Sequence, residues 1–135
     1  MRRLVPFFGL LTLLLSADIA SAQPACRGAT QPAQVAELLF GRSIGGRFGV
    51  TEAKWARFLA DEVTPRFPDG LTVTDARGQW RENNRVIKER SKVLMIALPG
   101  HATDDERLAQ VIAAYKTRFN QRSVGLIVRQ ACVSF

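Results

Sequence analysis

Apolar residues in the second half of the chain recur at the spacing of an α-helix. This stripe consists of Leu108, Val111, Ile112, Tyr115 and Phe119. Spacings of three and four residues place these side chains on one side, so the pattern predicts a helix that packs on a core. Residues 103–106 (TDDE) have the sequence of a capping box, in which the first and last side chains bond to free backbone amides. The helix is therefore expected to start at Thr103.

A second helix is predicted for residues 51–63. Its stripe consists of Trp55, Phe58, Leu59, Glu62 and Val63. Thr51 is suited to be the N-cap, because a threonine hydroxyl accepts a hydrogen bond from an amide in the first turn. Pro65 ends this helix, since the residue before a proline avoids helical backbone angles.

Residues 71–81 and 85–98 have the pattern of a β-hairpin joined at Asn83-Asn84. Asparagine tolerates the positive φ angles that a two-residue turn requires. Such a turn places Asp75 opposite Lys92, as a cross-strand pair of opposite charge. A bulge at Gly78 is the alternative, and it would shift the register by one residue.

The order of all elements indicates the fold class. Residues 35–41 form a short apolar run suited to a buried strand, and residues 123–135 form a final β-rich stretch. The resulting order is β-α-β-β-α-β, which is typical of the ferredoxin-like α+β arrangement. We therefore expect a single domain over residues 35–135, with a four-stranded antiparallel sheet and two helices on one face.

Residues 1–22 have the pattern of a cleaved export signal. Arg2 and Arg3 precede an apolar run over residues 4–15, and residues 20–22 (ASA) form a cleavage site. The run is too short to span a membrane, which takes about 20 apolar residues; an uncleaved anchor is the alternative. Cleavage predicts a periplasmic or secreted protein with an N-terminal arm over residues 23–34 and no transmembrane segment in the mature chain.

The two cysteines, Cys26 and Cys132, are expected to form a disulfide. In an oxidising compartment a cysteine pair is more often bridged than free. The alternative is a lipoprotein in which Cys26 is the lipid-modified N-terminus. Gln23 disfavours that alternative, because it stands where a lipoprotein signal needs an aliphatic side chain.

The chain is basic, with 19 Lys+Arg against 12 Asp+Glu and a net charge of +7. Loss of residues 1–22 leaves 17 basic and 11 acidic residues, a net charge of +6. Sheets of this topology that bind RNA stack bases on aromatic side chains, and residues 88–95 (KERSKVLM) contain none. We therefore expect no nucleic-acid partner and interpret the charge as an aid to solubility.

Several short motifs point to one family. They are residues 39–41 (LFG), 64–73 (TPRFPDGLTV), 78–80 (GQW), 89–92 (ERSK), 115–119 (YKTRF) and 131–135 (ACVSF). Together they resemble the exported bacterial proteins of domain-of-unknown-function family 3574, over roughly residues 35–135. The resemblance implies a small exported domain and brings no activity, cofactor or catalytic residue with it.

Residue types that would support metal or hydrolase chemistry are scarce. His101 is the only histidine, and it lies in a loop without a nucleophile motif. With the cysteines bonded to each other, a soft-ligand metal site cannot be assembled, so we expect neither metal nor cofactor. Residues 41–49 lack both common phosphate-binding signatures. This glycine-rich loop, with Arg42 and Arg47 beside its glycine pair, is either an anion site or a flexible connection.

The sheet itself offers the best candidate surface. Two helices cover one face of four strands, and residues 93–98 (VLMIAL) are apolar on both sides. The side chains of Val93, Met95 and Ala97 therefore need a cover. A second subunit, the N-terminal arm, or a bound ligand could supply it. The polar residues expected beside such a ligand are Arg42, Thr72, Thr74, Trp80, Arg90 and Ser91.

These observations favour a non-enzymatic exported domain that associates with itself, or binds a partner or small ligand, through the uncovered sheet face. The alternative is a small metal-free enzyme of the dimeric α+β-barrel type, acting on an apolar or acidic metabolite. Its candidate residues would be Arg42, Arg90 and Ser91, beside Trp80. That alternative depends on fold analogy alone.

Overall fold

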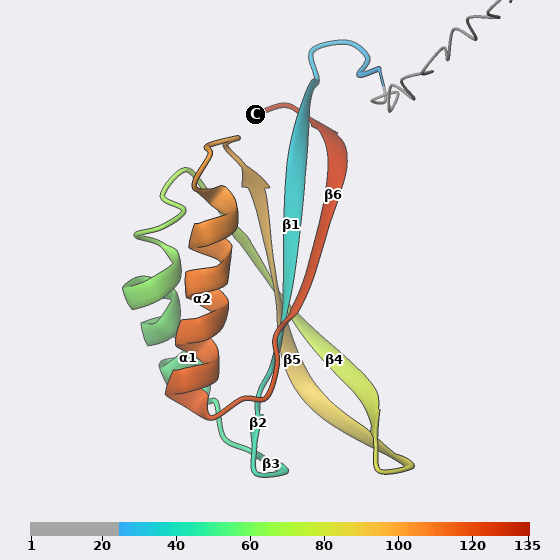
Figure 1. The fold of residues 1–135 in the computed structure, drawn as a ribbon, viewed down its shortest axis with the longest axis vertical. Helices are drawn as coiled ribbons and strands as arrows, with labels where there is room; N and C mark the ends of the chain where they lie inside the picture. The colour runs from blue at the N-terminus through green and yellow to red at the C-terminus, as the bar shows by residue number, and fades with distance from the viewer. Residues whose placement is uncertain (1–24) are drawn as a thin grey trace, which may run out of the picture.

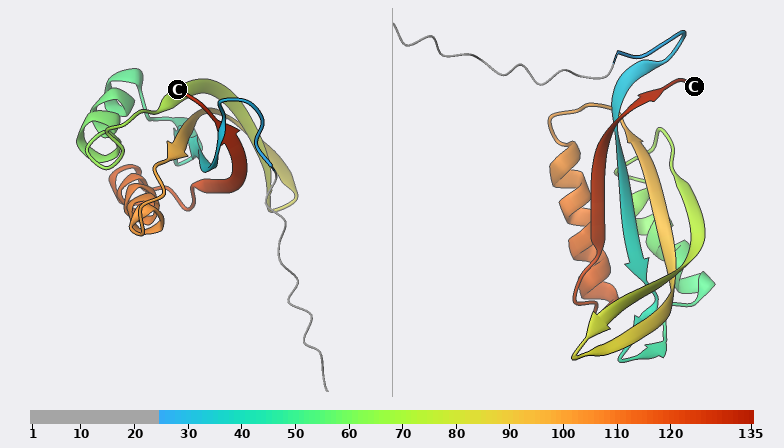
Figure 2. Two further views of the ribbon diagram at one scale, coloured as in Figure 1. Left: turned by 90° about the horizontal axis from the view of Figure 1, so that it is seen from above. Right: turned by 90° about the vertical axis from the view of Figure 1, so that its right-hand side faces the viewer.

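The computed structural model describes residues 25–135, so the predicted export signal lies outside the described part of the chain. Four long strands form one antiparallel sheet in the order β4-β5-β1-β6. They are β1 (Gln31–Gly41), β4 (Thr72–Glu82), β5 (Arg85–Leu98) and β6 (Gly125–Val133). Helices α1 (Glu52–Phe58) and α2 (Asp104–Phe119) lie on the same side of this sheet (Figures 1 and 2). This is the ferredoxin-like α+β arrangement expected from the order of elements.

The β4–β5 hairpin has the expected register. Asp75 pairs with Lys92, and the pairing continues without a shift from Thr72 to Glu82, so Gly78 forms no bulge. Asn83 and Asn84 turn the chain with φ angles of 46° and 61°. The hairpin extends past the ends of both helices (Figure 1).

Strand β1 starts at Gln31, four residues before the apolar run from which it was predicted. The last four residues of the predicted arm, 31–34, belong to the sheet, and Gln31 pairs with Val133 of β6. Pro32 has no backbone amide proton to donate. Pairing of β1 with β5 begins only at Gln34, so the proline costs no hydrogen bond to β5 and is compatible with the strand. The long partner strand β6 therefore extends β1 beyond its apolar run.

The expected loop between β1 and α1 contains a small hairpin. Strands β2 (Ser43–Ile44) and β3 (Arg47–Phe48) pair with each other in a second sheet. Gly45 and Gly46 between them have φ angles of 58° and 80°, a region that glycine enters without steric cost. The glycine pair therefore forms a tight turn rather than a flexible connection.

The two helices begin differently. Thr51 caps α1 as expected, since its Oγ1 accepts a hydrogen bond from Lys54 N, and the helix continues as a π-helix, η1 (Leu59–Val63). Helix α2 corrects the predicted capping box, because Thr103 makes no side-chain capping bond. Asp104 Oδ2 instead accepts bonds from Gly100 N and His101 N, each at 2.9 Å. The carboxylate thus stabilises the loop that enters the helix.

An aromatic cluster fills the core between the helices and the sheet. Its members are Phe40, Trp55, Phe58, Tyr115 and Phe119. Neighbouring ring centroids lie between 4.6 and 6.0 Å apart, in the edge-to-face range that adds to the hydrophobic stabilisation. Both predicted helical stripes contribute to this cluster, with Leu108 and Val111 buried beside it.

Cys26 and Cys132 form the expected disulfide, with their Cα atoms 5.5 Å apart. It joins the segment before β1 to the end of β6, at the end of the sheet where the C-terminus lies (Figure 1). Such a bridge fits an oxidising compartment such as the periplasm or the cell exterior. None of the helices within residues 25–135 is long and apolar enough to cross a membrane.

Removal of the bridge is expected to cost much of the folding stability. The cysteines are 106 positions apart, and closing a loop of that length stabilises by about 4–5 kcal/mol through the entropy of the unfolded chain. The double variant Cys26→Ser, Cys132→Ser should lose about this amount in urea unfolding, and reduced wild type should match it. A change below about 1 kcal/mol would show that the unfolded chain is not constrained in this way.

Candidate functional site

Two cationic side chains are buried where the apolar core ends, toward the hairpins. Arg42 follows β1 and is 3% exposed, and Lys92 of β5 is 5% exposed. Lys92 lies in phase with Leu94 and Ile96, so the alternation of the strand points it to the helix side. Buried cations are stable only when acidic or backbone groups bind them.

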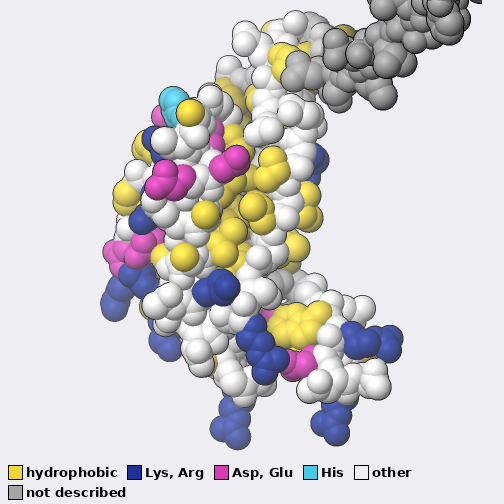
Figure 3. All heavy atoms as spheres, viewed as in Figure 1, with side chains coloured by type: hydrophobic (Ala, Val, Ile, Leu, Met, Phe, Trp, Pro, Cys, Tyr) yellow, Lys and Arg dark blue, Asp and Glu magenta, His cyan; other side chains and the backbone are white. Residues whose placement is uncertain are grey.

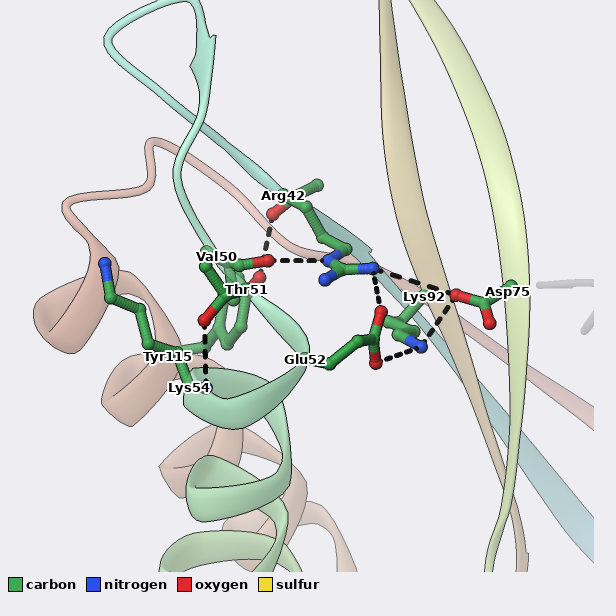
Figure 4. Close-up of polar contacts among 9 residues, drawn as sticks. Arg42, Val50, Thr51, Glu52, Lys54, Asp75, Lys92 and Tyr115 are labelled. Atoms are coloured by element: carbon green, nitrogen blue, oxygen red, sulfur yellow. Dashed lines mark hydrogen bonds and ion pairs between the residues drawn. The ribbon is translucent and has the colours of Figure 1, made fainter.

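Two carboxylates supply these partners. Arg42 Nη1 lies 2.6 Å from Glu52 Oε1 and 3.8 Å from Asp75 Oδ1, and Lys92 Nζ lies 3.0 Å from Glu52 Oε2 and 2.6 Å from Asp75 Oδ1 (Figure 4). Each acid thus bridges both bases. We call Arg42, Glu52, Asp75 and Lys92 the ion cluster.

The ion cluster shifts the pKa values of Glu52, Asp75 and Lys92. A hydrogen bond from Lys92, and to a smaller extent one from Arg42, lowers the pKa of Glu52 below its ordinary value of 4.5. A hydrogen bond from Lys92 lowers the pKa of Asp75 below its ordinary value of 3.8. Burial alone would lower the pKa of Lys92, but its bonds to Asp75 and Glu52 raise it. All these groups are therefore charged at neutral pH.

Backbone contacts fix Arg42 within the loop that follows β1. Its Nε donates to Val50 O at 2.8 Å, and its own carbonyl accepts from the amides of Gly49 and Val50. The β2–β3 hairpin therefore folds back and brings Glu52 to the cluster. The Nη2 atom of Arg42 is buried without a hydrogen-bond partner among the described residues. The guanidinium carbon of Arg42 lies 4.9 Å from the ring centroid of Phe48.

The end of β1 is held from both sides of the sheet. Tyr115 donates its hydroxyl proton to Gly41 O at 2.8 Å, and burial raises the pKa of this phenol, which keeps it a donor. On the other side, Glu89 accepts a bond from Ser43 N. A Cβ at position 41 would lie 2.2 Å from Glu89 Oε1. A side chain at position 41 would therefore displace the Glu89 carboxylate from Ser43 N.

A cleft of about 380 Å³ opens beside the ion cluster. It is lined by Arg42, Glu52, Asp75, Ala76, Arg77 and Arg90, and we call it the arginine cleft. Another groove, of about 580 Å³, lies between the loop before β4 and the start of α2, and it includes the exposed His101. Among residues 25–135, no group of three His, Cys, Asp or Glu side chains could hold a metal ion.

The sheet face opposite the helices is uncovered (Figure 2). Leu39, Met95 and Ile127 on this face are 40%, 40% and 46% exposed. Register places them together, since Met95 and Ile127 both lie opposite Glu37, and Leu39 is two residues along β1. We call this surface, which also includes the half-buried Val93 and Ala97, the open face. Described arm residues 25–30 lie beyond the end of β1 and do not cover it (Figure 1).

The six predicted ligand-binding residues fall on opposite sides of the sheet. Arg42 and Arg90 line the arginine cleft on the helix side. The other four lie on the opposite side of the sheet, as the alternation of side chains along a strand requires. The register places them with the open-face positions; they are Thr72, Thr74, Trp80 and Ser91. The four residues suggested for an enzyme, Arg42, Arg90, Ser91 and Trp80, therefore do not form one site.

Sequence reasoning missed Glu52 as a member of the ion cluster, and it missed the burial of Lys92. Asp75 and Lys92 were expected to pair across the hairpin, and they do. The position of Lys92 in phase with Leu94, Ile96 and Leu98 was the available signal for its burial. Glu52 gave no such signal, because only the folded-back loop brings it to the cluster.

These features define an α+β domain of the ferredoxin-like arrangement with an ion cluster around two buried cations, a basic cleft and an uncovered sheet face. Residues 35–135 match the family described as "Protein of unknown function (DUF3574)", and the chain belongs to this family. No curated protein matches the chain in sequence.

Solved structures share the fold at low sequence identity. A phage SAM lyase in complex with S-methyl-5′-thioadenosine is 16% identical with a TM-score of 0.59, over 85% of this chain and 97% of that chain. A phage SAM lyase in its apo state is 14% identical with a TM-score of 0.54, over 84% of this chain and 92% of that chain. CutA from Synechococcus elongatus PCC7942 gives 9% and 0.50, over 79% and 81%. These likenesses show the fold alone.

The ion cluster predicts a loss of stability in acid. The lowered pKa values of Glu52 and Asp75 mean that their stabilisation is present above their ordinary values of 4.5 and 3.8, and is lost as pH falls through the lower folded values. The double variant Glu52→Gln, Asp75→Asn should have a lower thermal midpoint than wild type at neutral pH, because two buried cations lose their partners.

The difference in thermal midpoint should shrink at acid pH, as the pH falls through the lowered folded pKa values of Glu52 and Asp75 and the wild-type carboxylates take up protons. Asp69→Asn, in the turn before β4, is the control for removing an exposed aspartate, and it should leave the midpoint unchanged at both pH values. An equal deficit of the double variant at both pH values would show that charge is not the source of the stabilisation.

Proposed function

We propose that the protein is an exported domain that associates with a second copy of itself through the open face. The exposure of Leu39, Met95 and Ile127 on three adjacent strands supports this proposal above any other observation. Met95 and Ile127 flank Glu37 in the register, and exposed apolar side chains grouped on one face in this way mark interaction sites in soluble proteins. Export is supported by the disulfide, which is characteristic of oxidising compartments.

The charges on the open face suit a second copy better than an oppositely charged partner. Arg129 Nη2 lies 2.8 Å from Glu37 Oε1, and this bond lowers the pKa of Glu37, so both groups are charged. The pair is neutral, although the chain has a net charge of +7. A two-fold interface brings a patch onto itself, and this patch can do so without like charges meeting.

The apolar surface also continues around the edge of the sheet. Leu126 and Val128 of β6 are 43% and 41% exposed on the side opposite to Ile127. Apolar side chains gather over the strip between α2 and β6, whereas Lys and Arg side chains gather at the hairpin end (Figure 3). An uncovered, apolar edge strand invites association, so β6 lies at the border of the proposed interface.

Sedimentation equilibrium tests the proposal with protein purified from a bacterial periplasm. The wild type should be a dimer in the micromolar range, and Ile127→Lys should be a monomer because it buries a charge in the interface. Val86→Lys is the matched control, since Val86 is 55% exposed and lies near the hairpin turn, on the other side of the sheet.

The control should remain dimeric at every concentration at which the wild type is dimeric. A monomeric wild type at submillimolar concentration would contradict the proposal. Equal dissociation of Val86→Lys would also contradict it, because the association would then depend on general charge rather than on the open face.

A further inference from the structure

We propose that the arginine cleft is a binding site for a small dianion, such as a phosphate monoester or a dicarboxylate, held by Arg77 and Arg90. The cleft lies on the helix side of the sheet. It is therefore separate from the open face, and the site does not depend on self-association.

Arg77 and Arg90 are directly opposite each other on β4 and β5. Like charges in this position repel, which makes an antiparallel pair less stable. Neither side chain has an ion-pair partner within residues 25–135, and both are exposed toward the cleft. The pairing of these two charges is therefore unfavourable in the free protein, and it leaves both guanidinium groups available to an anion.

The acids that line the cleft are already bound. Glu52 and Asp75 bridge the buried cations Arg42 and Lys92. Together with Arg77 and Arg90, the region therefore has four cationic and two anionic side chains, an excess of two positive charges. A ligand with two negative charges would balance this excess, whereas a cation would be repelled.

Phe48 restricts the position of Arg90 before a ligand arrives. The guanidinium carbon of Arg90 lies 5.2 Å from the ring centroid of Phe48, on which Arg42 also stacks. The Arg42 amide donates to Arg90 O, which ties the two backbones together. Stacked guanidinium groups keep their planar donor forks free for carboxylate or phosphate oxygens. Preorganised arginines lose less entropy on binding.

The size of the cleft favours a metabolite-sized ligand. Its volume of about 380 Å³ is at the lower end of the range for small-molecule pockets. Its wall combines Ala76 with charged groups from β4, from β5, from the loop after β1 and from the start of α1. A compact ligand in this cleft can contact Arg77 and Arg90 at the same time. It therefore binds two guanidinium groups, whereas an isolated surface arginine offers one.

Isothermal titration with inorganic phosphate and with succinate, at constant ionic strength, tests this site. Binding of either probe should be saturable, and the probe that binds more tightly identifies the anion class. Arg77→Gln and Arg90→Gln should each weaken binding about tenfold, as expected for a lost charge-assisted hydrogen bond. Arg81→Gln is the matched control, because it removes the same charge from the same side of β4, nearer the turn, and it should retain wild-type affinity.

The thermal midpoint without ligand gives an independent result. Arg77→Gln should raise this midpoint, because it removes the repulsion of Arg90, whereas a structural arginine would lower it on removal. Absence of saturable binding of both probes would overturn the proposal. Equal weakening by Arg81→Gln would also overturn it, since the effect would then come from the general positive field.

Discussion

The sheet of this domain is longer than the helices that cover it, and it has two faces for only one layer of helices. Strand β5 has 14 residues, which at a rise of about 3.3 Å each extend for about 46 Å. Helix α2 has 16 residues, which at about 1.5 Å each extend for about 24 Å. One face and one end of the sheet therefore remain outside the core. The proposed interface and the proposed ligand site occupy these two regions.

The ion cluster marks the border between the core and the uncovered end. Beyond Leu94, the helix-facing position of β5 is occupied by Lys92, and beyond Phe40 the chain continues to Arg42. Long basic side chains can bury their stems against apolar neighbours while their charged ends reach polar partners. The border is thus polar without leaving cationic groups unpaired, and it connects α1, β4 and β5 through side chains.

Local patterns were sufficient to predict most of the architecture. The turn at Asn83-Asn84 determined the hairpin register, because both residues accept positive φ angles. The helical stripes and the cysteine pair were likewise confirmed. The start of β1 and the loop entering α2 differed, since each depends on a partner: β6 extends β1 to Gln31, and the Asp104 carboxylate bonds the loop amides instead of Thr103.

The candidate site was predictable only in part. Arg90 and Ser91 are neighbours in one strand, so alternation alone places them on opposite sides, and the expected single pocket was inconsistent with that rule. The meeting of Arg42 with Glu52 could not be inferred, because it requires the β2–β3 hairpin to fold back on Val50. Contacts made through loops depend on tertiary packing, which periodicity does not encode.

The position of the disulfide determines which end of the domain faces outward when the protein is attached to a surface or to another protein. Cys26 and the C-terminus lie at one end of the sheet, while the β4–β5 turn and the β2–β3 hairpin lie at the opposite end (Figure 1). Fusion or immobilisation through either terminus would therefore leave the basic end pointing away from the attachment point. The covalent bridge would also transmit tension between the termini, so that a pulling force bypasses the hydrogen-bonded strands between them.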